Sequence, residues 1–278
     1  MGNEKENQLS KNGERLLQNL TSGEFTMGGR YRKVFRMLPA DPRCRFCNAP
    51  FDGFGGSLMK LAFNKYPSNY NPHVCNTCFD IIKKEQIGAE TELSFLFADV
   101  RGSTSLAEGM SSVEFSQLIN RFYQASTDVL IQSDALIDKL IGDEVAAFYL
   151  PSFVGSNHAH KTIEAAKELL RVTGHADPDG PWIPVGVGIH TGQAWIGAVG
   201  SSEQVTDITA LGDAVNVAAR LASQARTGEI LISEESRKQA SLAQSDFEER
   251  LLELKGKSEL MGVWVMRVEG SSNETLAD

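Results

Sequence analysis

The stretch that decides the fold is SFLFADVRGST, residues 94–104, where an apolar run leads into a small polar turn. A nearly continuous apolar run of this length predicts a buried strand. Asp99 interrupts the run near its end, and a buried charge is stable only when it is paired or bound to a metal. Gly102, Ser103 and Thr104 follow, and such a turn lets backbone N–H groups approach a phosphate closely. The stretch therefore predicts a divalent cation between a strand-end carboxylate and a polyphosphate, with an Asp-capped turn without a ligand as the alternative.

Composition and charge narrow the class of protein. The chain has 278 residues, enough for about two domains. A hydrophobic content of 41% and a charged content of 23% are ordinary for a soluble globular protein. The net charge of −9 argues against a nucleic-acid binder that relies on bulk electrostatics. Because no apolar run is long enough to span a bilayer and no signal pattern opens the chain, we expect a cytoplasmic protein without a transmembrane segment.

The first 40 residues form a helical and basic segment. Leucines recur at helical spacing in residues 1–23, which predicts a short amphipathic helix or a frayed terminus. Basic residues alternate with apolar ones over 30–45, a pattern more typical of a solvated face than of a nucleic-acid or membrane site.

A cysteine-rich module follows at 41–90. Two C-x-x-C pairs are present, namely Cys44 with Cys47 and Cys75 with Cys78. Without an export signal, this pattern favours a metal over disulfides, and four thiolates suit tetrahedral zinc. An iron–sulfur cluster, replacement of one thiolate by His73, and unliganded thiols are the alternatives. The 27 residues between the pairs are poor in core formers, so a metal would staple the module.

Within the module, residues 48–56 and 67–72 are rich in Asn, Gly and Pro, which predicts loops. Residues 79–92 read as a connector to the second domain. That second domain spans 91–269, and a disordered tail at 270–278 ends the chain.

The second domain alternates strands and helices. A capping box at Ser111 and Glu114 starts an amphipathic helix. The remaining expected elements are strands at 135–141 and 145–150 around the turn Gly142-Asp143, a helix at 157–173, strands at 185–189, 194–199 (hairpinning back) and 205–209, a helix after Gly212, and strands near 229–232, 247–254 and 262–268. The order β-α-β-β-α-β-β predicts an α+β, ferredoxin-like core.

Two pairs of polar residues carry the candidate chemistry. In a β-α-β-β core the hairpin tip with Asp143 lies beside the strand with Asp99, although 44 positions separate them. Paired carboxylates at a sheet end suit two divalent ions, whereas Asp143 alone would be an ordinary turn residue. Asn216 and Arg220 are one helical turn apart and suit a ribose oxygen and a phosphate, with a solvated helix face as the alternative.

Four segments together resemble one known family. They are FADVRGST at 97–104, KLIGD at 139–143, GIHTG at 188–192 and LGDAVNVAARL at 211–221. In this order they resemble the catalytic domain of class III nucleotidyl cyclases, of the bacterial adenylyl type, over about 91–269.

The resemblance implies a reaction and a division of roles. ATP would be converted to 3′,5′-cyclic AMP and pyrophosphate. Asp99 and Asp143, with the backbone carbonyl of Val100, would hold two Mg²⁺ or Mn²⁺ ions, one activating the ribose 3′-hydroxyl and one neutralising the triphosphate. Asn216 would orient the ribose, and Arg220 would stabilise the transferring phosphate.

The resemblance also implies how the base and the phosphates are bound. Lys139 and Thr209 would select adenine through a cationic donor and a hydroxyl acceptor, and guanylyl cyclases place an acidic residue where Lys139 stands. The turn at 102–104 would receive the triphosphate, and Lys255 would contact its terminal phosphates. Many members carry Phe in place of Ser103 and Asp in place of Thr209, and the latter departure weakens the assignment of the base.

Family active sites form between two catalytic domains, so the resemblance implies a head-to-tail homodimer with two equivalent sites. The cysteine module would then regulate the enzyme by setting the dimer geometry. A guanylyl cyclase and a catalytically silent nucleotide-binding sensor are the alternatives.

Overall fold

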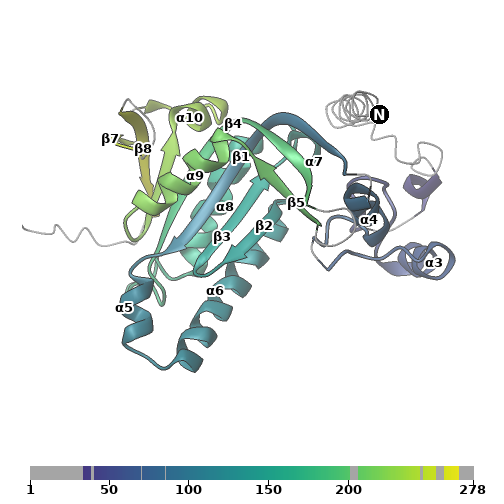
Figure 1. Cartoon of the computed structure of the whole chain (residues 1–278), viewed down its shortest axis with the longest axis horizontal. Coiled ribbons are helices and arrows are strands. Elements are labelled where there is room, and N and C mark those ends of the chain that lie inside the picture. Colours follow the sequence, from purple (N-terminus) through teal and green to yellow (C-terminus); the bar gives the residue numbers. More distant parts are fainter. Residues whose placement is uncertain are drawn as a thin grey trace, which may run out of the picture. The chain divides into compact units, whose positions relative to one another are not determined.

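The computed structural model describes seven parts of the chain: residues 34–38, 41–69, 71–84, 86–200, 206–244, 247–254 and 260–268 (Figure 1). The predicted helix within 1–23, Lys255 and the predicted disordered tail lie outside the described residues. The chain divides into two compact units: Met1–Glu92 with Leu150–Gly155 and Gln193–Gly212, and Leu93–Tyr149 with Ser156–Gly192 and Asp213–Asp278.

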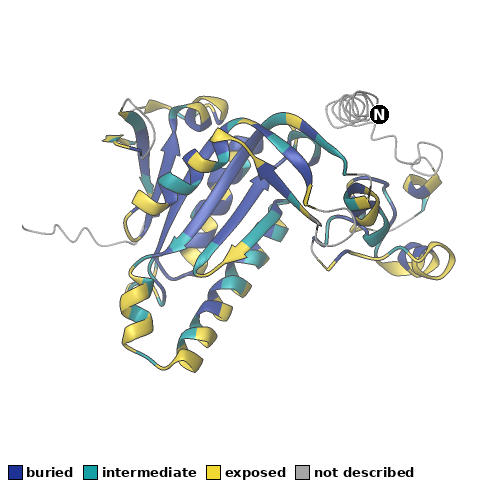
Figure 2. Cartoon of the chain, in the orientation of Figure 1, coloured by how far each residue is buried: buried dark blue, intermediate teal, exposed yellow. Residues whose placement is uncertain are grey.

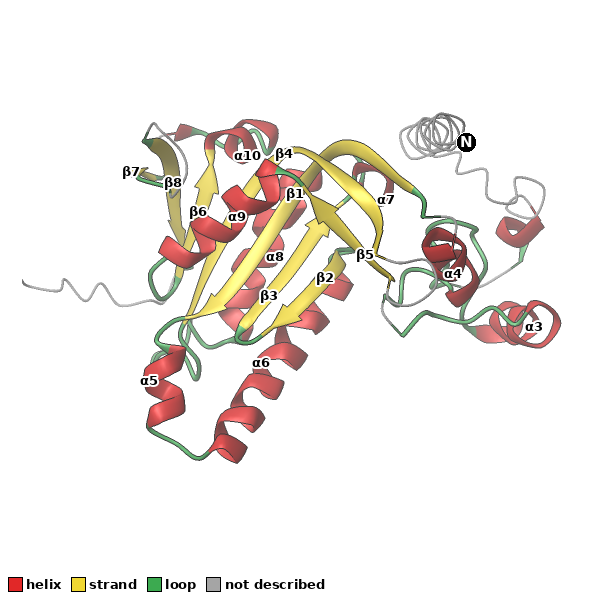
Figure 3. Cartoon of the chain, in the orientation of Figure 1, coloured by secondary structure: helices red, strands yellow, loops and turns green. Residues whose placement is uncertain are grey.

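The predicted ferredoxin-like core is confirmed. Its elements follow in the expected order: β1 (Gly88–Val100), α6 (Ser112–Gln132), β2 (Leu136–Ile141), β3 (Glu144–Tyr149), α8 (His158–Val172) and β4 (Val185–Gly200). The strands lie in the order β2-β3-β1-β4, which the sheet continues as β6-β8-β7, while β5 pairs with β4 (Figure 3). The order β2-β3-β1-β4 is that of the ferredoxin-like fold, in which the strands of two β-α-β units alternate within one sheet.

The other elements complete the two units. They are α3 (Gly53–Phe63), α4 (Asn76–Lys84), α5 (Ser103–Glu108), α7 (Pro151–Val154), β5 (Thr206–Leu211), α9 (Asp213–Gln224), β6 (Glu229–Ser233), α10 (Glu234–Gln239), β7 (Glu248–Leu252) and β8 (Met261–Arg267). The capping box at Ser111 and Glu114 is present and starts α6, as predicted.

Helices cover both faces of the sheet, and the central strands are buried between them (Figure 2). Helices α6 and α8 pack on one face, and α9 lies on the other (Figure 1). Successive residues of a strand point to opposite faces of the sheet. The valines of β4 therefore face one layer of helices, and its glycines face the other. A Cβ at Gly188 would come within 2.1 Å of the Ala222 backbone nitrogen, so only glycine lets α9 approach this closely.

Strand β4 corrects the prediction of two short strands with a hairpin between them. It runs unbroken from Val185 to Gly200, and the hairpin forms later, where β4 pairs with β5. Thr191 lies in the middle of β4, between the two strands that were expected. Its hydroxyl is buried and shares hydrogen bonds with Ser94 (2.7 Å) and Ser236 (2.9 Å), so a polar residue is satisfied inside the sheet.

The cysteine module also differs from the prediction, because helices replace two segments expected to be loop or connector. Asp52 caps α3 by accepting a hydrogen bond from the Gly53 N–H. Gly56, a weak helix former, is required there, since a Cβ would lie 2.4 Å from the Phe51 carbonyl carbon. Helix α4 occupies the start of the expected connector, directly after Cys75.

An ion cluster joins β6 to β7 and β8 around Glu229, whose side chain is buried. Arg250 donates to the two Glu229 oxygens at 2.8 and 2.9 Å, and Arg267 donates at 2.6 Å. Burial opposes ionisation of Glu229, but these bonds and one from the Arg226 N–H outweigh it and lower its pKa to about 2.

We expect Glu229→Gln to lower the free energy of unfolding by about 3 kcal/mol at pH 7, because two guanidinium groups lose their buried carboxylate. A lowered pKa stabilises the fold above the unfolded-state pKa of about 4.3, and this contribution is lost as the pH falls towards about 2. Urea unfolding of the unmodified chain and of Glu229→Gln measures this effect. The difference between their free energies of unfolding should shrink as the pH falls over that range. Glu248→Gln is the matched control, because Glu248 bonds the same arginines from the surface and should matter by under about 1 kcal/mol. Equal losses in both variants would contradict the prediction.

Candidate functional site

Strand pairing brings the two predicted carboxylates to the same end of the sheet. Asp99 is the penultimate residue of β1, and its Cα partner in β3 is Glu144. The Val100 N–H donates to the Asp143 carbonyl at 3.2 Å, so the turn between β2 and β3 lies against the end of β1. Tyr123 of α6 holds the same turn by donating to the Gly142 carbonyl at 2.8 Å.

Neighbouring carboxylates add to the effect of burial on the pKa values of Asp99 and Glu144. Burial raises the pKa of Asp99 most, the nearby Asp143 adds to this, and Arg101 opposes it. Burial together with Asp99 and Asp143 raises the pKa of Glu144 to about 7. Three carboxyl groups therefore share a partly buried place with one guanidinium group. Carboxylate oxygens crowded in this way fit a hard divalent cation, which would relieve their repulsion.

Arg101 and Glu144 were not predicted as part of the site. The Arg101 Nη2 lies 2.6 Å from Asp99 Oδ2, and its Nη1 donates to the carbonyls of Ser223 (2.7 Å) and Ala225 (3.3 Å). Arg101 thus ties the strand-end carboxylate to the C-terminal end of α9. Glu144 was detectable in principle, because a two-residue hairpin places the residue after Asp143 opposite the end of β1.

The predicted donor pair lies on α9. Asn216 is exposed and Arg220 is half-buried, one turn apart. Within the described ranges, neither side chain makes a hydrogen bond or an ion pair. The opposite side of α9 is buried against the sheet, so packing holds the helix while the two donor side chains are available to a ligand.

The remaining predicted contacts lie in several places. Gly102 has a φ of 65°, with open space where a Cβ would lie, and α5 begins at Ser103, inside the predicted turn. Lys139 is half-buried on β2 in one compact unit. Thr209 is buried on β5 in the other unit, opposite Gly197 of β4.

The four cysteines form one buried cluster. Their sulfur atoms all lie within 4.8 Å of one another, and Cys47 Sγ is 3.7 Å from Cys75 Sγ. Among the described residues, this group does not include His73, so the alternative of a histidine ligand is not supported. Lys65 lies 3.8 Å from the Cys75 sulfur and offsets part of the negative charge that thiolates would carry.

Hydrogen bonding and burial shift the pKa values of the cysteines in opposite directions. Side-chain hydrogen bonds, first of all with Cys44, lower the pKa of Cys75, while burial raises the pKa of Cys44. The Cys75 sulfur also accepts from the Cys78 N–H at 3.4 Å, and the Cys75 N–H donates to the Cys44 sulfur at 3.3 Å. Sulfur atoms that accept from backbone N–H groups in this way are typical of metal-binding cysteine turns.

Across the described ranges, every helix is too short or too polar to cross a lipid bilayer.

Comparison with curated proteins finds cyclases. The chain is 28% identical over 233 residues to an adenylate cyclase of Anabaena cylindrica, covering 76% of this chain and 46% of that protein. It is 30% identical over 145 residues to an adenylate cyclase of Mycobacterium bovis, covering 52% and 32% respectively. The chain thus spans less than half the length of these curated relatives.

Solved structures give the same fold. The guanylyl cyclase Cya2 is 26% identical with a TM-score of 0.57, and 68% of this chain covers 99% of it. The adenylyl cyclase CyaB from P. aeruginosa is 25% identical with a TM-score of 0.56, and 66% of this chain covers 98% of it. The family model for the adenylate and guanylate cyclase catalytic domain matches residues 85–267. Since this match takes in both carboxylates and the whole of α9, the chain belongs to the adenylate and guanylate cyclase catalytic domain family.

Proposed function

We propose that this protein is an adenylyl cyclase that converts ATP to 3′,5′-cyclic AMP and pyrophosphate. The observation that carries the proposal is the meeting of Asp99 and Asp143 at one end of the sheet, in a chain of the cyclase family. The name of the Anabaena cylindrica relative, an adenylate cyclase, supports the same substrate.

The reaction is an internal phosphoryl transfer. The ribose 3′-oxygen forms a bond to the α-phosphorus and loses its proton, while the bond from that phosphorus to the bridging oxygen breaks and pyrophosphate leaves. Asp99, Asp143 and the Val100 carbonyl would hold two Mg²⁺ or Mn²⁺ ions, which when bound activate the hydroxyl and neutralise the triphosphate. The open space at Gly102, directly before α5, leaves room for phosphate oxygens close to the backbone.

The donors on α9 would act on the ribose and on the reacting phosphate. Asn216 would hold the ribose so that its 3′-oxygen faces the α-phosphorus. Arg220 would donate to phosphate oxygens, whose charge grows in the transition state. A donor aimed at developing charge contributes about 100- to 1,000-fold in rate.

We place each site between two copies of the chain, head to tail. Arg101 fixes Asp99 to the C-terminal end of α9, whereas Asn216 lies about 10 Å further back along that helix. An Asn216 side chain so placed suits the carboxylates of a second copy better than those of its own chain. Within the described part of the chain, Asn216 and Arg220 are without partners, as expected of groups that complete a shared site.

The choice of base must come from this chain's own residues, since the similar structures include both a guanylyl and an adenylyl cyclase. Lys139 would donate to adenine N1, and Thr209 would accept from the exocyclic amine. A site built with this pattern leaves buried groups unpaired when guanine enters.

The test is competition of equal ATP and GTP with Mn²⁺ in a single assay. We expect cyclic AMP as the main product, and Lys139→Glu should lower kcat/KM for ATP by about 100-fold and raise the share of cyclic GMP. Lys60→Glu, on an exposed part of α3, is the control for the charge change. A preference of the unmodified chain for GTP would establish the guanylyl alternative, and no turnover of either nucleotide would establish the silent sensor.

For the cysteine cluster we propose a structural zinc ion. Four sulfur atoms around one zinc at 2.3 Å are about 3.8 Å apart, close to the 3.7 Å between Cys47 and Cys75. An iron–sulfur cluster has several metal atoms, so its thiolates must lie farther apart than these. Metal analysis with a visible spectrum decides between them, because zinc is colourless. Four cysteines without disulfides, and ATP as substrate, fit a cytoplasmic protein.

A further inference from the structure

The cysteine cluster shares one compact unit with the hairpin formed by β4 and β5. That unit contains residues Met1–Glu92, Leu150–Gly155 and Gln193–Gly212. The cysteine module is therefore packed with parts of the catalytic domain far from it in sequence. Two separate routes of contact make this connection, one from each C-x-x-C pair.

The first route leaves the pair Cys44 and Cys47. Phe46 lies between them in sequence, and its ring meets the ring of Phe153 in α7 edge-on, with 5.3 Å between the centroids. Both rings are buried. An aromatic pair of this geometry stabilises the contact beyond the effect of the area that it buries.

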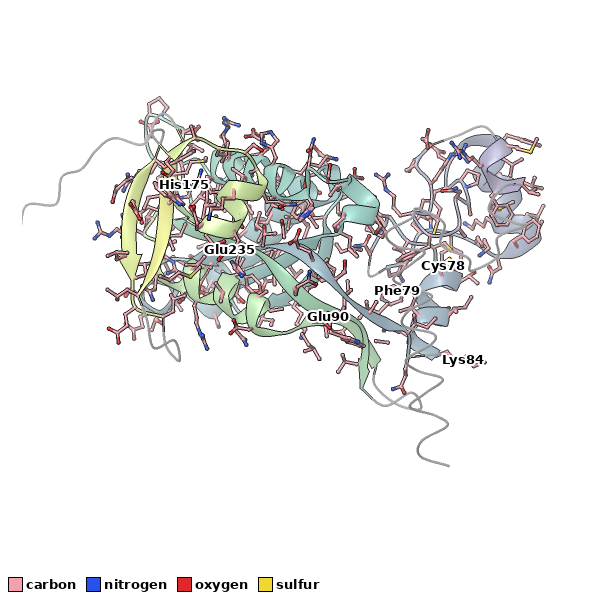
Figure 4. All side chains as sticks on the ribbon, turned by 90° about the horizontal axis from the view of Figure 1, so that it is seen from above. Cys78, Phe79, Lys84, Glu90, His175 and Glu235 are labelled. Carbon is pink, nitrogen blue, oxygen red and sulfur yellow. The ribbon has the colours of Figure 1, made fainter. Side chains whose placement is uncertain are left out.

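The second route leaves the pair Cys75 and Cys78. Helix α4 begins directly after Cys75, carries Cys78 and packs against β5. Figure 4 shows Cys78 and Phe79 on this helix and Lys84 at its end. Strand β5 is therefore in contact with a helix whose first turn carries one of the four clustered cysteines.

The chain that leaves α4 reaches the strand opposite Thr209. The Ile87 carbonyl accepts from the Ala198 N–H at 3.1 Å. A Cβ at Gly197 would lie 2.4 Å from Gly88 Cα, so the two backbones are in direct contact. Gly197 is in turn the Cα partner of Thr209 in β5. A continuous set of backbone contacts thus runs from the cysteine module to the residue proposed to select the base.

We infer that the metal bound by the four cysteines braces the β4–β5 hairpin and so positions Thr209. Metal-binding energy is folding energy in a module with so few apolar residues. When the ion leaves, the two C-x-x-C turns separate, and α4 loses the end that holds it against β5. The effect on Thr209 rests on the proposed function, whereas the brace itself requires no catalysis.

The test follows amide hydrogen exchange in the full chain in three states: zinc-loaded, stripped by a chelator, and reloaded with Zn²⁺. Stripping should speed exchange in residues 193–200 and 206–212 by at least about tenfold, because the hairpin then opens locally. Reloading should reverse this change. Residues 136–149, which form β2 and β3 in the other unit, should change by less than about twofold.

A variant of the chain separates the bracing contact from the metal site. Phe46→Ala keeps all four thiols but removes the contact with Phe153. We expect it to retain zinc, to speed exchange in the same hairpin, and to lower the ratio of kcat/KM for ATP to that for GTP by at least about threefold. Phe54→Ala is the matched control, because the Phe54 ring on α3 is 77% exposed.

Unchanged exchange in the hairpin after stripping would overturn the brace, and so would an equal rise in residues 136–149, which would show general unfolding. A hairpin that loosens in a protein that turns over no nucleotide would support the brace and refute the proposed function. A hairpin that stays protected after stripping, in a protein that converts ATP, would overturn the brace and support the proposed function.

Discussion

Asp99→Asn is expected to reduce cyclic AMP formation by at least about 1,000-fold, because a neutral amide holds a divalent cation far more weakly than a carboxylate does. The fold should survive the change. Asn has the shape of Asp, and Arg101 keeps its two hydrogen bonds to the carbonyls at the end of α9. Removing one charge also relieves the repulsion that raises the pKa of Glu144. We therefore expect a free energy of unfolding within about 1 kcal/mol of the unmodified chain.

Initial rates at several Mn²⁺ concentrations, together with Mn²⁺ binding measured directly, check this expectation. Binding of Mn²⁺ should weaken in parallel with the loss of rate. Asp128→Asn is the matched control, since Asp128 is exposed on α6 and, among the described residues, accepts side-chain hydrogen bonds from Gln124 alone. Full activity of Asp99→Asn would remove the basis of the proposed reaction.

Local patterns in the sequence predicted the core of the fold. The capping box at Ser111, the turn at Gly142 and Asp143, and the apolar run before Asp99 each specify one element through nearby residues. The order of these elements then fixes the sheet, because a β-α-β-β-α-β chain has few ways to bury its apolar faces. Local signals therefore sufficed for the core that the structure confirms.

The error in β4 occurred where distant contacts decide the local structure. Thr191 continues β4 because Ser94 and Ser236, far from it in sequence, satisfy its hydroxyl. No window of residues around Thr191 contains these partners. Helix α3 is a different case, because its partners are near in sequence: Asp52 caps it, and its Gly56 packs on Phe51. There the high content of glycine favoured a loop over the helix.

The candidate site also contains residues that local patterns predicted and residues that they did not. Topology alone brings Asp99 and Asp143 together, because both follow from the pairing of strands. The role of Arg101 depends on where the C-terminal end of α9 lies, which no sequence pattern gives. The link from the cysteines to Thr209 depends on contacts between backbones at glycines, where there is no side chain to indicate them.

Equal mixing of Asp99→Asn with Arg220→Ala should restore cyclase activity to about one quarter of that of the unmodified chain, although each variant alone is nearly inactive. Arg220→Ala alone should lose about 100- to 1,000-fold, the usual cost of one donor to the transition state. Random exchange makes half of the dimers mixed, and each mixed dimer has one site with both changes and one site with neither.

The recovery depends on the two residues coming from different protomers, so its control uses two changes from the same side. Asp99→Asn mixed with Asp143→Asn should stay inactive, because every site then carries a damaged carboxylate pair. The measurement is the rate per total chain as a function of mixing ratio, after incubation long enough for subunits to exchange. A rate that stays low at every ratio, in chains shown to form mixed dimers, would place Arg220 and Asp99 in the site of a single protomer. In that case the contact from Arg101 to the end of α9 would hold together the parts of one active site. In the shared arrangement the same contact connects two different active sites.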